Sequence, residues 1–473
     1  MIWVAFVTKN KRQAVSGVVV RDFKDVDLGD ERRNLRTIAS VAALASDPRR
    51  TFPQVFRDEA AREGFYRLLR NPAVDPEAIL LPHVEASVER AAASRSVVIA
   101  HDESELLFKG EKRQGLGDLS NGSRGLYIRG SLVVDIADEL RPVLGVVRME
   151  RYVFKKGRHP ASSSSTLRAR KKPESEKETD WWRRAALETS ELLATHPDVI
   201  HVMDREADTY ALMAALAEGQ CRFVIRARHN RVIDDELKLK DVVWEERGES
   251  FRQVPLSRRR LINRRGAHPA RDERNAKLSI RSVSVTIPRP EASKSEVAEL
   301  SLNVVHVYEP RPPRGEAAIE WLLLTTEPVE TKEQMTRVVD AYRARWRIEE
   351  YFKALKTGCD VESRQLESIE TLSNALAIFV PIAWALLNLR NSAHGDAPAS
   401  LMFSADQLQL MRALCPEAKL SKAPSLRAAM LVIASLGGLI KSNGEPGWAV
   451  LGRGFQDFVS AERGWRAARG QEK

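Results

Sequence analysis

The sequence predicts an α/β protein whose strand-rich centre lies between helical segments. Apolar residues recur every three or four positions over residues 23–93, the spacing of amphipathic helices. Runs rich in β-branched residues over 96–108, 125–136 and 143–153 predict three consecutive strands in an antiparallel meander. Helical patterns then return and close the chain, over residues 372–389, 405–414, 426–439 and 455–468.

The composition fits a multidomain protein with a polyanionic partner. With 473 residues and a hydrophobic fraction of 43%, the chain exceeds what one core usually serves, so two or three domains are expected. Lysine and arginine total 75 against 65 acidic residues, giving a formal net charge of +10 and an isoelectric point near 9.5. A basic balance favours a partner rich in phosphate, and nucleic acid is the leading candidate.

The cysteines argue against a disulfide-rich or zinc-binding protein, and the start of the chain argues against a secreted or membrane protein. Cys221, Cys359 and Cys415 lie far apart without a Cys-x-x-Cys pair, so neither a disulfide framework nor a thiolate zinc site is suggested. The apolar opening over residues 1–7 is too short to span a bilayer, and its basic residues follow it, the reverse of a secretory signal. We therefore expect a cytoplasmic protein without a membrane partner.

The segment 21–93 is predicted to be a helical DNA-binding domain. Its basic residues gather in two groups, which are Arg32, Arg33 and Arg36, then Arg62, Arg67 and Arg70. The turn at Arg70-Asn71-Pro72 ends the second expected helix. The alternative is an ordinary solvated helix face, since charge alone does not decide between the two.

Beyond the meander, the centre alternates helices with strands and then changes character. Residues 181–195 and 207–216 read as helices, and 199–204 and 222–228 as strands. Arginines, among them Arg226, flank the apolar run of the last strand, and a polar basic loop over 159–179 could contact phosphate. Residues 229–327 are predicted to be a β-rich insertion with a basic face. Its cationic stretch holds Arg258, Arg259, Arg260, Arg264 and Arg265, and the alternative is that this stretch is merely a soluble loop.

Three acids each end or face an expected regular element, which makes them candidate catalytic residues. Asp102 follows the first strand of the meander, Asp204 follows a later apolar strand, and Glu349 lies on a late helix. Three carboxylates suit a hard divalent cation, Mg²⁺ or Mn²⁺. His101 and His201 flank the acids, but strand alternation does not place them with the aspartates, so both read as structural. Two such ions can promote in-line phosphoryl transfer, which is nuclease or transesterification chemistry.

A helix predicted over 338–356 frames one of these acids with cations and a phenol. At about 100° per residue, four side chains fall within roughly 60° of one another on its surface, namely Tyr342, Arg345, Glu349 and Lys356. Lys353 lies on the same face, whereas helix phase turns Glu350 about 80° away. Glu350 and the nearby Glu206 are therefore not expected to be ligands.

Several motifs of this chain resemble those of the Tn-five (IS-four-type) DDE transposases. They are Asp204-Arg205-Glu206-Ala207-Asp208, Trp321-Leu322-Leu323-Leu324-Thr325-Thr326-Glu327-Pro328-Val329-Glu330 and Tyr342-Arg343-Ala344-Arg345-Trp346-Arg347-Ile348-Glu349-Glu350. The resemblance covers nearly the whole chain, from the Asp27-Leu28-Gly29-Asp30-Glu31-Arg32-Arg33 segment to the aromatic carboxyl end.

The resemblance implies a ribonuclease-H-like core over 94–370, interrupted by the insertion at about 229–327. It also implies that Asp102, Asp204 and Glu349 bind two Mg²⁺ or Mn²⁺ ions. The Tyr342, Arg345, Glu349 and Lys356 set would be the family's Tyr-Arg-Glu-Lys signature, whose cations hold terminal phosphates, with Lys353 as a helper. Further DNA contacts are expected from the basic residues singled out above, namely Arg32, Arg33, Arg67, Arg70 and Arg226.

By the same similarity, the protein would cleave element ends through a hairpin intermediate and join the 3′ ends to target DNA. Trp321 would stack on a base flipped out of the donor end, the alternative being a buried core tryptophan before a strand. Residues 21–93 would bind the ends, residues 371–473 would form a dimerisation region, and cleavage would occur in trans within a homodimer on DNA of the bacterial nucleoid.

Two rival functions stay open at the level of sequence. One is a DNA-binding protein without catalysis that inhibits transposition by forming mixed dimers, and an intact acid triad argues against it. The other is a structure-specific nuclease with the same core, which would cut DNA but never join 3′ ends to a target.

Overall fold

The computed structural model describes residues 15–109, 113–153, 180–233, 237–245, 250–256, 271–393, 397–440 and 445–469. The chain folds into two compact units that interleave along the sequence. The first unit comprises residues 1–95, 103–158 and 347–473, and the second comprises residues 96–102 and 159–346. The strand β1 (Val97–Leu107) therefore contributes its first half to the second unit and its second half to the first unit.

The first unit begins with one short helix that was not predicted, followed by the helices expected over 21–93. They are α2 (Val15–Asp22), α3 (Glu31–Ser46), α4 (Phe52–Val55), α5 (Glu59–Arg70) and α6 (Pro76–Ala92). An aspartate before each of three helices accepts hydrogen bonds from free N–H groups of the first turn, and these caps are Asp30, Asp58 and Asp75. Phe52, Phe56 and Phe65 pack together beneath them. Capping and aromatic burial thus explain why this segment is helical.

The first unit also contains the predicted meander. β3 (Arg124–Asp135) pairs antiparallel with β4 (Val143–Tyr152) and with the two-residue strand β2 (Gly117–Asp118). Nearly every side chain of β3 is buried, because α6 packs on its neighbour β4 and covers the meander. The strand order predicted from the β-branched runs is confirmed here.

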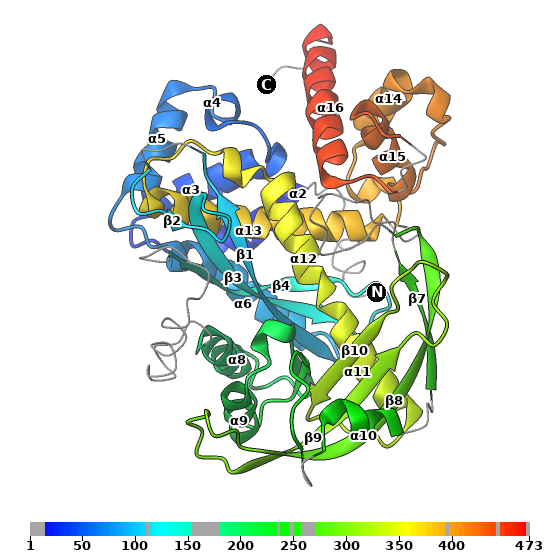
Figure 1. Ribbon diagram of the computed structural model, residues 1–473. Helices are drawn as coiled ribbons and strands as arrows, with labels where there is room; N and C mark the ends of the chain where they lie inside the picture. The colour runs from blue at the N-terminus through cyan, green and yellow to red at the C-terminus, as the bar shows by residue number, and fades with distance from the viewer. Residues whose placement is uncertain are drawn as a thin grey trace. The chain divides into compact units, whose positions relative to one another are not determined.

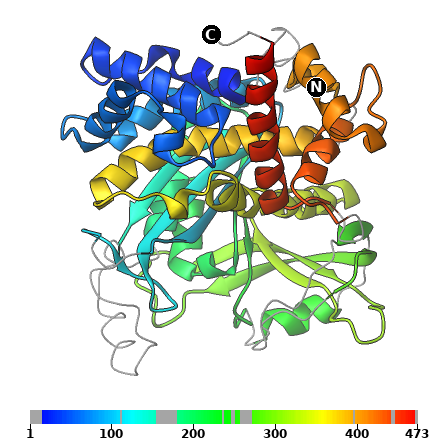
Figure 2. The same cartoon turned by 90° about the horizontal axis from the view of Figure 1, so that it is seen from above.

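A long apolar helix forms the centre of the first unit. α13 (Ile369–Ser392) packs against α2, α3, α5 and α6, and Figure 2 shows it running alongside these helices. By length and composition α13 could cross a membrane, but 94% of its apolar window is buried inside the protein, as in the core helix of a globular domain. After it come α14 (Ala405–Leu414), α15 (Leu426–Leu436) and α16 (Trp448–Ala468), which share a second apolar core.

The second unit is built on a mixed sheet in the strand order β1-β5-β6-β10-β9-β8-β7. β1, β5 (Val199–Met203) and β6 (Phe223–Arg226) are parallel neighbours, and the later strands are antiparallel. These later strands are β7 (Ser250–Leu256), β8 (Arg274–Pro288), β9 (Glu299–Tyr308) and β10 (Glu320–Thr325). Their apolar side chains form one core with α8 (Asp180–Leu192), α9 (Tyr210–Glu218) and α10 (Leu239–Glu245) (Figure 1).

The β-rich insertion predicted over 229–327 is continuous with the sheet of the second unit. β10 pairs with β6 on one side and with β9 on the other, so the insertion widens the sheet instead of forming a separate module. The five arginines expected on its basic face, Arg258 to Arg265, lie outside the described residues, as does the basic loop over 159–179. Their predicted phosphate contacts stay predictions.

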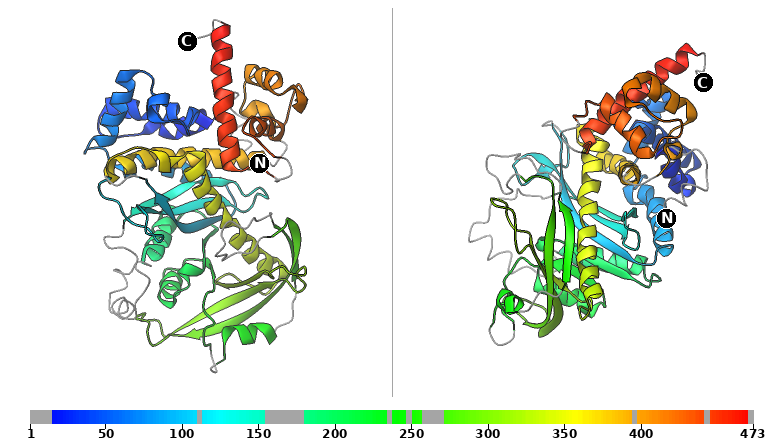
Figure 3. Two further views of the ribbon diagram at one scale, coloured as in Figure 1. Left: turned by 45° about the horizontal axis from the view of Figure 1, so that its top comes forward. Right: turned by 90° about the vertical axis from the view of Figure 1, so that its right-hand side faces the viewer.

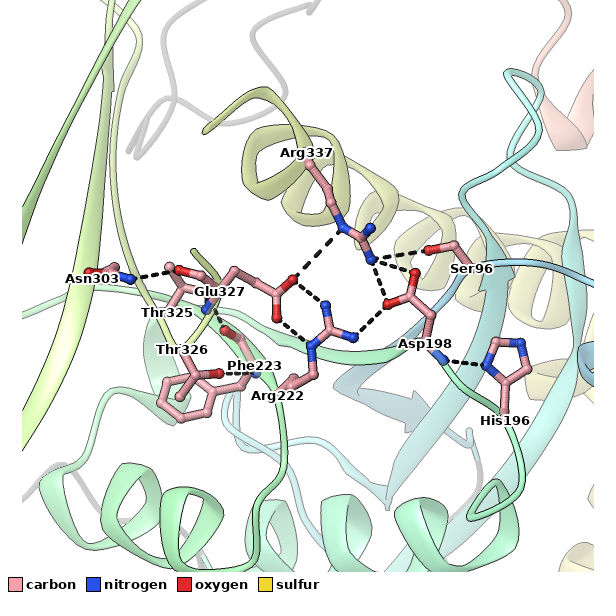
Figure 4. A network of polar contacts seen from close by, with 10 residues as sticks. All are labelled: Ser96, His196, Asp198, Arg222, Phe223, Asn303, Thr325, Thr326, Glu327 and Arg337. Atoms are coloured by element: carbon pink, nitrogen blue, oxygen red, sulfur yellow. Dashed lines mark hydrogen bonds and ion pairs between the residues drawn. The ribbon is translucent and has the colours of Figure 1, made fainter. Parts of the chain in front are cut away.

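An ion-pair network closes the edge of the sheet at which β5 and β6 begin (Figure 4). Arg222 lies between two acids, with Nη1 2.6 Å from Asp198 Oδ1 and Nη2 2.5 Å from Glu327 Oε2. Arg337 Nη2 donates to both Asp198 carboxylate oxygens at 2.6 Å. The network therefore ties β5, β6, β10 and α11 (Lys332–Ala344) together at one edge.

The network makes stability depend on pH in the acid range. Burial alone would raise the pKa of Asp198, but hydrogen bonds from Arg337, Ser96 and Arg222 outweigh it and lower the pKa to about 2. An unfolded aspartate has a pKa of about 3.9, so the carboxylate stabilises the fold fully above about pH 5 and progressively less toward pH 2. We expect Asp198→Asn to lower the free energy of unfolding, measured in urea, at pH 6, and to lower it by less at pH 3. An equal loss at both pH values would contradict the low pKa of Asp198.

Candidate active site

Asp102 lies inside β1, two residues beyond the last position at which β1 pairs with β5, and Asp204 directly follows β5. The prediction that Asp102 follows its strand is wrong, because β1 continues to Leu107. The register of β1 with β5 runs from Val97 opposite Val199 to Ala100 opposite Val202. Continued by two residues, it places Asp102 opposite Asp204. Side chains at paired positions of parallel strands point to the same face, about 4.8 Å apart along the sheet. The strand register therefore brings together two acids that are about a hundred residues apart in the sequence.

Each aspartate is oriented by a separate local contact. Asp204 is the N-cap of the short helix η3 (Arg205–Ala207), and its Oδ1 accepts a hydrogen bond of 2.8 Å from the N–H of Glu206. Asp102 Oδ2 accepts from Arg345 Nη1 at 2.7 Å. The Arg345 side chain is 7% exposed and that of Asp102 is 17% exposed, so solvent screens this charge-assisted pair only weakly. The carboxylates are thus held in place rather than free to rotate.

The helix predicted over 338–356 is broken, which corrects the prediction of one continuous element. α11 ends at Ala344, Arg345 forms its C-cap, and α12 (Trp346–Lys353) begins at the next residue. The N–H of Arg345 bonds back to Tyr342, three residues earlier, so the turn is tighter than α-helical. The break occurs at the arginine that contacts Asp102, and the strong local helix pattern of the sequence did not reveal it.

Two aromatic rings lie beside Arg345 within the second unit. Trp321, near the start of β10, is partly exposed, and its ring centroid is 5.7 Å from that of the buried Tyr342. The Arg345 guanidinium lies 5.9 Å from the Tyr342 ring and 5.5 Å from the ring of Trp346. Trp346 is 51% exposed and was not singled out from sequence, although its position between two arginines was a signal. The alternative of a fully buried core Trp321 is wrong.

The other signature residues lie further along the chain, in the first unit. Glu349 and Lys353 are on α12, and Lys356 is in the π-helical turn η5 (Ala354–Gly358). In that turn the N–H of Cys359 bonds to the carbonyl of Ala354, five residues earlier. This wider turn rotates each residue by less than the 100° of an α-helix, so Lys356 does not keep the helix phase on which the prediction rested.

The environment of Lys356 is largely buried. Burial lowers the pKa of Lys356, and the charges of Glu362 and Glu105 act in the opposite direction. Lys353 precedes this turn as its N-cap residue.

The two histidines beside the acids contact each other. His101 Nε2 lies 2.9 Å from His201 Nδ1, both rings are buried, and His201 Nε2 lies 2.8 Å from Ser190 Oγ. Burial lowers the pKa of His201 to about 4, so this ring is neutral at physiological pH. Strand alternation turns His101 away from the face that carries Asp102, in agreement with the structural role expected for it.

Two further acids, Glu206 and Glu350, were not expected to be metal ligands. Glu206 is exposed, and the N–H of this residue is the group that Asp204 caps. Glu350 accepts a hydrogen bond of 2.8 Å from Arg347 Nη1. Glu206 contacts Asp204 only through its backbone N–H in these bonds, and the Glu350 contact involves neither candidate aspartate.

The predicted DNA-contact arginines occupy different surroundings. In the helical segment, Arg32 is exposed, Arg33 donates to the carbonyl of Leu28 at 2.9 Å, and Arg67 pairs with Glu63 at 2.5 Å. Arg70 is also exposed and lies over the Tyr66 ring at 5.7 Å. In the second unit, Arg226 Nη2 donates to the carbonyl of Glu320 at 3.1 Å. Arg32, Arg67 and Arg70 are therefore the exposed members of the set, as expected for residues that contact phosphate.

Two of these helices approach closely because one residue has no side chain. A Cβ atom at Gly64 on α5 would lie 2.5 Å from the Arg36 guanidinium on α3. Glycine therefore lets α3 and α5 pack with their basic residues near each other. This packing places both predicted basic groups on one helical segment of the first unit.

The candidate metal ligands offer oxygen atoms only, which suits Mg²⁺ or Mn²⁺. In the described ranges, no group of three acid, histidine or cysteine side chains is close enough to hold a metal ion as it stands. The pair Asp102 and Asp204 does fit the donor chemistry, with one oxygen of Asp102 taken by Arg345. A divalent ion would compete with that guanidinium for the same carboxylate.

Comparison with known protein families decides what kind of site this is. Residues 17–74 match the family described as transposase DNA-binding, and residues 169–383 match the family described as transposase DDE domain. The chain contains a transposase DNA-binding domain and a transposase DDE domain. Its DNA-binding domain coincides with the capped helices α2 to α5, and its DDE domain includes Asp204 and Glu349.

The family assignment accounts for the fold and the class of partner. The three-stranded meander followed by the parallel strands β5 and β6 is the ribonuclease-H-like core of a DDE domain. The transposase acts on DNA, and DDE domains typically use divalent metal ions. The chain is also similar to the piggyBac transposase in a synaptic complex with hairpin DNA, with a TM-score of 0.35, 13% identity, and coverage of 77% of this chain and 67% of that one. A likeness at this level adds nothing to the assignment.

Proposed function

We propose that the protein is a cut-and-paste DNA transposase of the Tn-five (IS-four) type. In this proposal it cleaves element ends through a hairpin intermediate and joins the 3′ ends to target DNA. The observation that supports the proposal is the β1–β5 register, which, continued two residues beyond its last pair, would set Asp102 beside Asp204 of the DDE domain. Acids at the carboxyl ends of parallel strands are where ligand-binding residues of open α/β sheets concentrate.

In the proposed mechanism, Asp102, Asp204 and Glu349 hold two divalent ions. Once bound, Mg²⁺ or Mn²⁺ would supply an activated water or 3′-hydroxyl and stabilise the leaving oxygen. Asp204 keeps its orientation through the cap on η3, and Asp102 through its bond with Arg345. These fixed orientations reduce the reorganisation that the carboxylates undergo during the reaction.

The cations around the acids would hold the DNA backbone in place. Arg345 donates to Asp102 through Nη1, and its guanidinium would hold a terminal phosphate beside that carboxylate. Lys353 and Lys356 would supply further positive charge, and Tyr342 keeps Arg345 in place through ring contact. Trp321, partly exposed beside Tyr342, would receive a flipped base.

The proposed assembly is a homodimer on two element ends in the bacterial cytoplasm. Residues 21–93, with Arg32, Arg33, Arg67 and Arg70, bind the ends, and Arg226 adds a contact from the catalytic core over 94–370. The helices of residues 371–473 would carry the dimer contacts.

The decisive experiment uses the DNA that flanks the gene. The purified protein is incubated with Mg²⁺, a linear fragment carrying the flanking inverted repeats, and a supercoiled target plasmid. We expect hairpin-ended products and fragments joined to the plasmid. Cleavage without joining would support the nuclease alternative, and binding without cleavage would support a non-catalytic inhibitor of transposition.

Loss of the Trp321 ring should separate two steps of that reaction. In Trp321→Ala, hairpin formation is expected to fall by about tenfold or more, because base stacking on an aromatic ring contributes ~1–3 kcal/mol. The first nick needs no flipped base and should stay near the wild-type rate. Denaturing gels resolve nicked from hairpin strands, with Trp321→Phe as the control that retains a stacking ring. Equal loss of both steps would count against base stacking.

A further inference from the structure

A cavity of about 400 Å³ lies within the first unit, away from the acids described above. Its walls come from the end of α3, from α13 and from the carboxyl-terminal helices, and Figure 3 shows α16 between the amino-terminal helices and the α14–α15 pair. The volume falls in the range of roughly 300–1,000 Å³ that is usual for small-molecule sites. The cavity is therefore large enough for an organic ligand.

The interior of this cavity is mainly apolar and aromatic. Phe403 stacks on Phe455 at 6.5 Å between ring centroids and meets Phe458 edge-on at 6.2 Å. Leu451 and Met430 complete this wall, and both are buried. Such a surface favours the hydrocarbon or aromatic body of a ligand over water.

Three hydrogen-bond donors of the lining lack an acceptor, whereas the one lining acceptor without a hydrogen bond in the described residues, Asp47 Oδ2, is ion-paired with Arg50. Arg49 Nε, Arg463 Nη1 and the indole Nε1 of Trp448 are buried without a hydrogen-bond partner in the part of the chain that the structure describes. Buried donors of this kind are costly unless something accepts from them. A ligand that satisfies them must carry acceptor oxygens.

The charges of the lining also favour an anion. Four arginines line the cavity, and only two acids, Asp47 and Glu462, accompany them. Glu462 pairs with Arg466 at 2.5 Å, and Asp47 pairs with Arg50 and lies 3.9 Å from Arg463. Within the described ranges this leaves Arg49 and Arg390 without a carboxylate at ion-pair distance. Burial lowers the pKa of both Arg390 and Arg463, as expected for guanidinium groups that lack full solvation.

We propose that this cavity is a binding site for an amphipathic organic carboxylate. The apolar body lies against Phe403, Phe455 and Phe458, and the carboxylate accepts hydrogen bonds from the arginines and from Trp448. The site is independent of the proposed transposition chemistry, because none of its residues belongs to the acid triad or its signature. Since α3 and α16 both line the cavity, a bound ligand stabilises the packing of α16 against the DNA-binding domain.

The test uses the full chain and the fluorescent probe 1-anilinonaphthalene-8-sulfonate, which has an aromatic body and an anionic group. We expect saturable binding to one site, a raised Tm, and displacement by decanoate at far lower concentration than by decanol. Val459→Trp, which fills the cavity, should abolish binding. Arg463→Gln should weaken it about tenfold or more, and Arg469→Gln on the same helix, outside the lining, should leave it unchanged.

Several results would overturn the assignment. Probe binding that never saturates, or that persists in Val459→Trp, would place the probe elsewhere on the protein. Displacement by decanol as effective as by decanoate would remove the case for an anion. If Val459→Trp does not fold, the test rests on an Arg463→Gln protein that has the wild-type Tm. Probe binding by this variant as strong as by the wild type overturns the proposal.

Discussion

Replacing Asp102, Asp204 or Glu349 with alanine is expected to abolish Mg²⁺-dependent strand cleavage. Metal ligation at such sites supplies several kcal/mol of transition-state stabilisation, so each loss should lower the rate at least about a thousandfold. DNA binding should persist, because the DNA-binding domain over residues 17–74 is separate in the sequence from all three acids. Cleavage is measured on end-labelled DNA, and binding is measured by gel shift in the same buffer.

Two neighbouring acids provide the matched controls for the triad. Glu206→Ala and Glu350→Ala remove a carboxylate from the same segments without touching the proposed ligands. Both variants should retain cleavage within about a few-fold of wild type, because Glu206 is exposed and Glu350 pairs with Arg347. An active Glu349→Ala protein would show that the third ligand is a different residue. Loss of cleavage in Glu350→Ala, with Glu349→Ala still active, would indicate that Glu350 is the third metal ligand.

Replacing Arg222 with alanine should destabilise the second unit by about 3 kcal/mol. Arg222 binds Glu327 through two hydrogen bonds, Nε to Oε1 at 2.7 Å and Nη2 to Oε2 at 2.5 Å. The Glu327 side chain is only 2% exposed, so without Arg222 a buried carboxylate keeps only a distant contact with Arg337, 3.8 Å away. For a unit of this size we expect a fall in Tm of roughly 6–10 °C, measured by calorimetry.

A second substitution tests whether the buried charge is the cause. In the double variant Arg222→Ala with Glu327→Gln the charge is gone, so its stability should exceed that of Arg222→Ala alone. Arg228→Ala, an exposed arginine two residues beyond β6, should change stability by less than about 0.5 kcal/mol. If Arg222→Ala unfolds at the wild-type temperature, the network does not stabilise the sheet edge.

Much of the fold could be predicted because its elements have local signals. β-branched runs marked β3 and β4, and apolar periodicity marked the helical segment that contains α3, α5 and α6. The insertion was also recognised as β-rich. Its continuity with the core sheet could not be predicted, because pairing between β6 and β10 joins residues about a hundred positions apart and leaves no local pattern.

The break between α11 and α12 shows a second limit. The residues from Tyr342 to Lys353 are good helix formers, so periodicity predicts one helix through Arg345. In the fold, the helix is interrupted at Arg345, whose N–H closes a tight local turn onto Tyr342 and whose side chain makes a charge-assisted bond to the distant Asp102. The π-helical turn at Lys356 likewise follows from packing rather than from composition.

By itself, the sequence indicated three acids on regular elements of a basic chain as candidate catalytic residues. It also determined which residue types surround them, because strand ends and helix phase follow from local periodicity. Only the tertiary structure decided that Asp102 lies in register with Asp204, that Arg345 binds one of them, and that a donor-lined cavity forms beside α16. Strand register, ion pairs and cavities form between segments that are far apart in the chain. Their contributions to stability depend on how deeply each group is buried, and burial exists only in the folded protein.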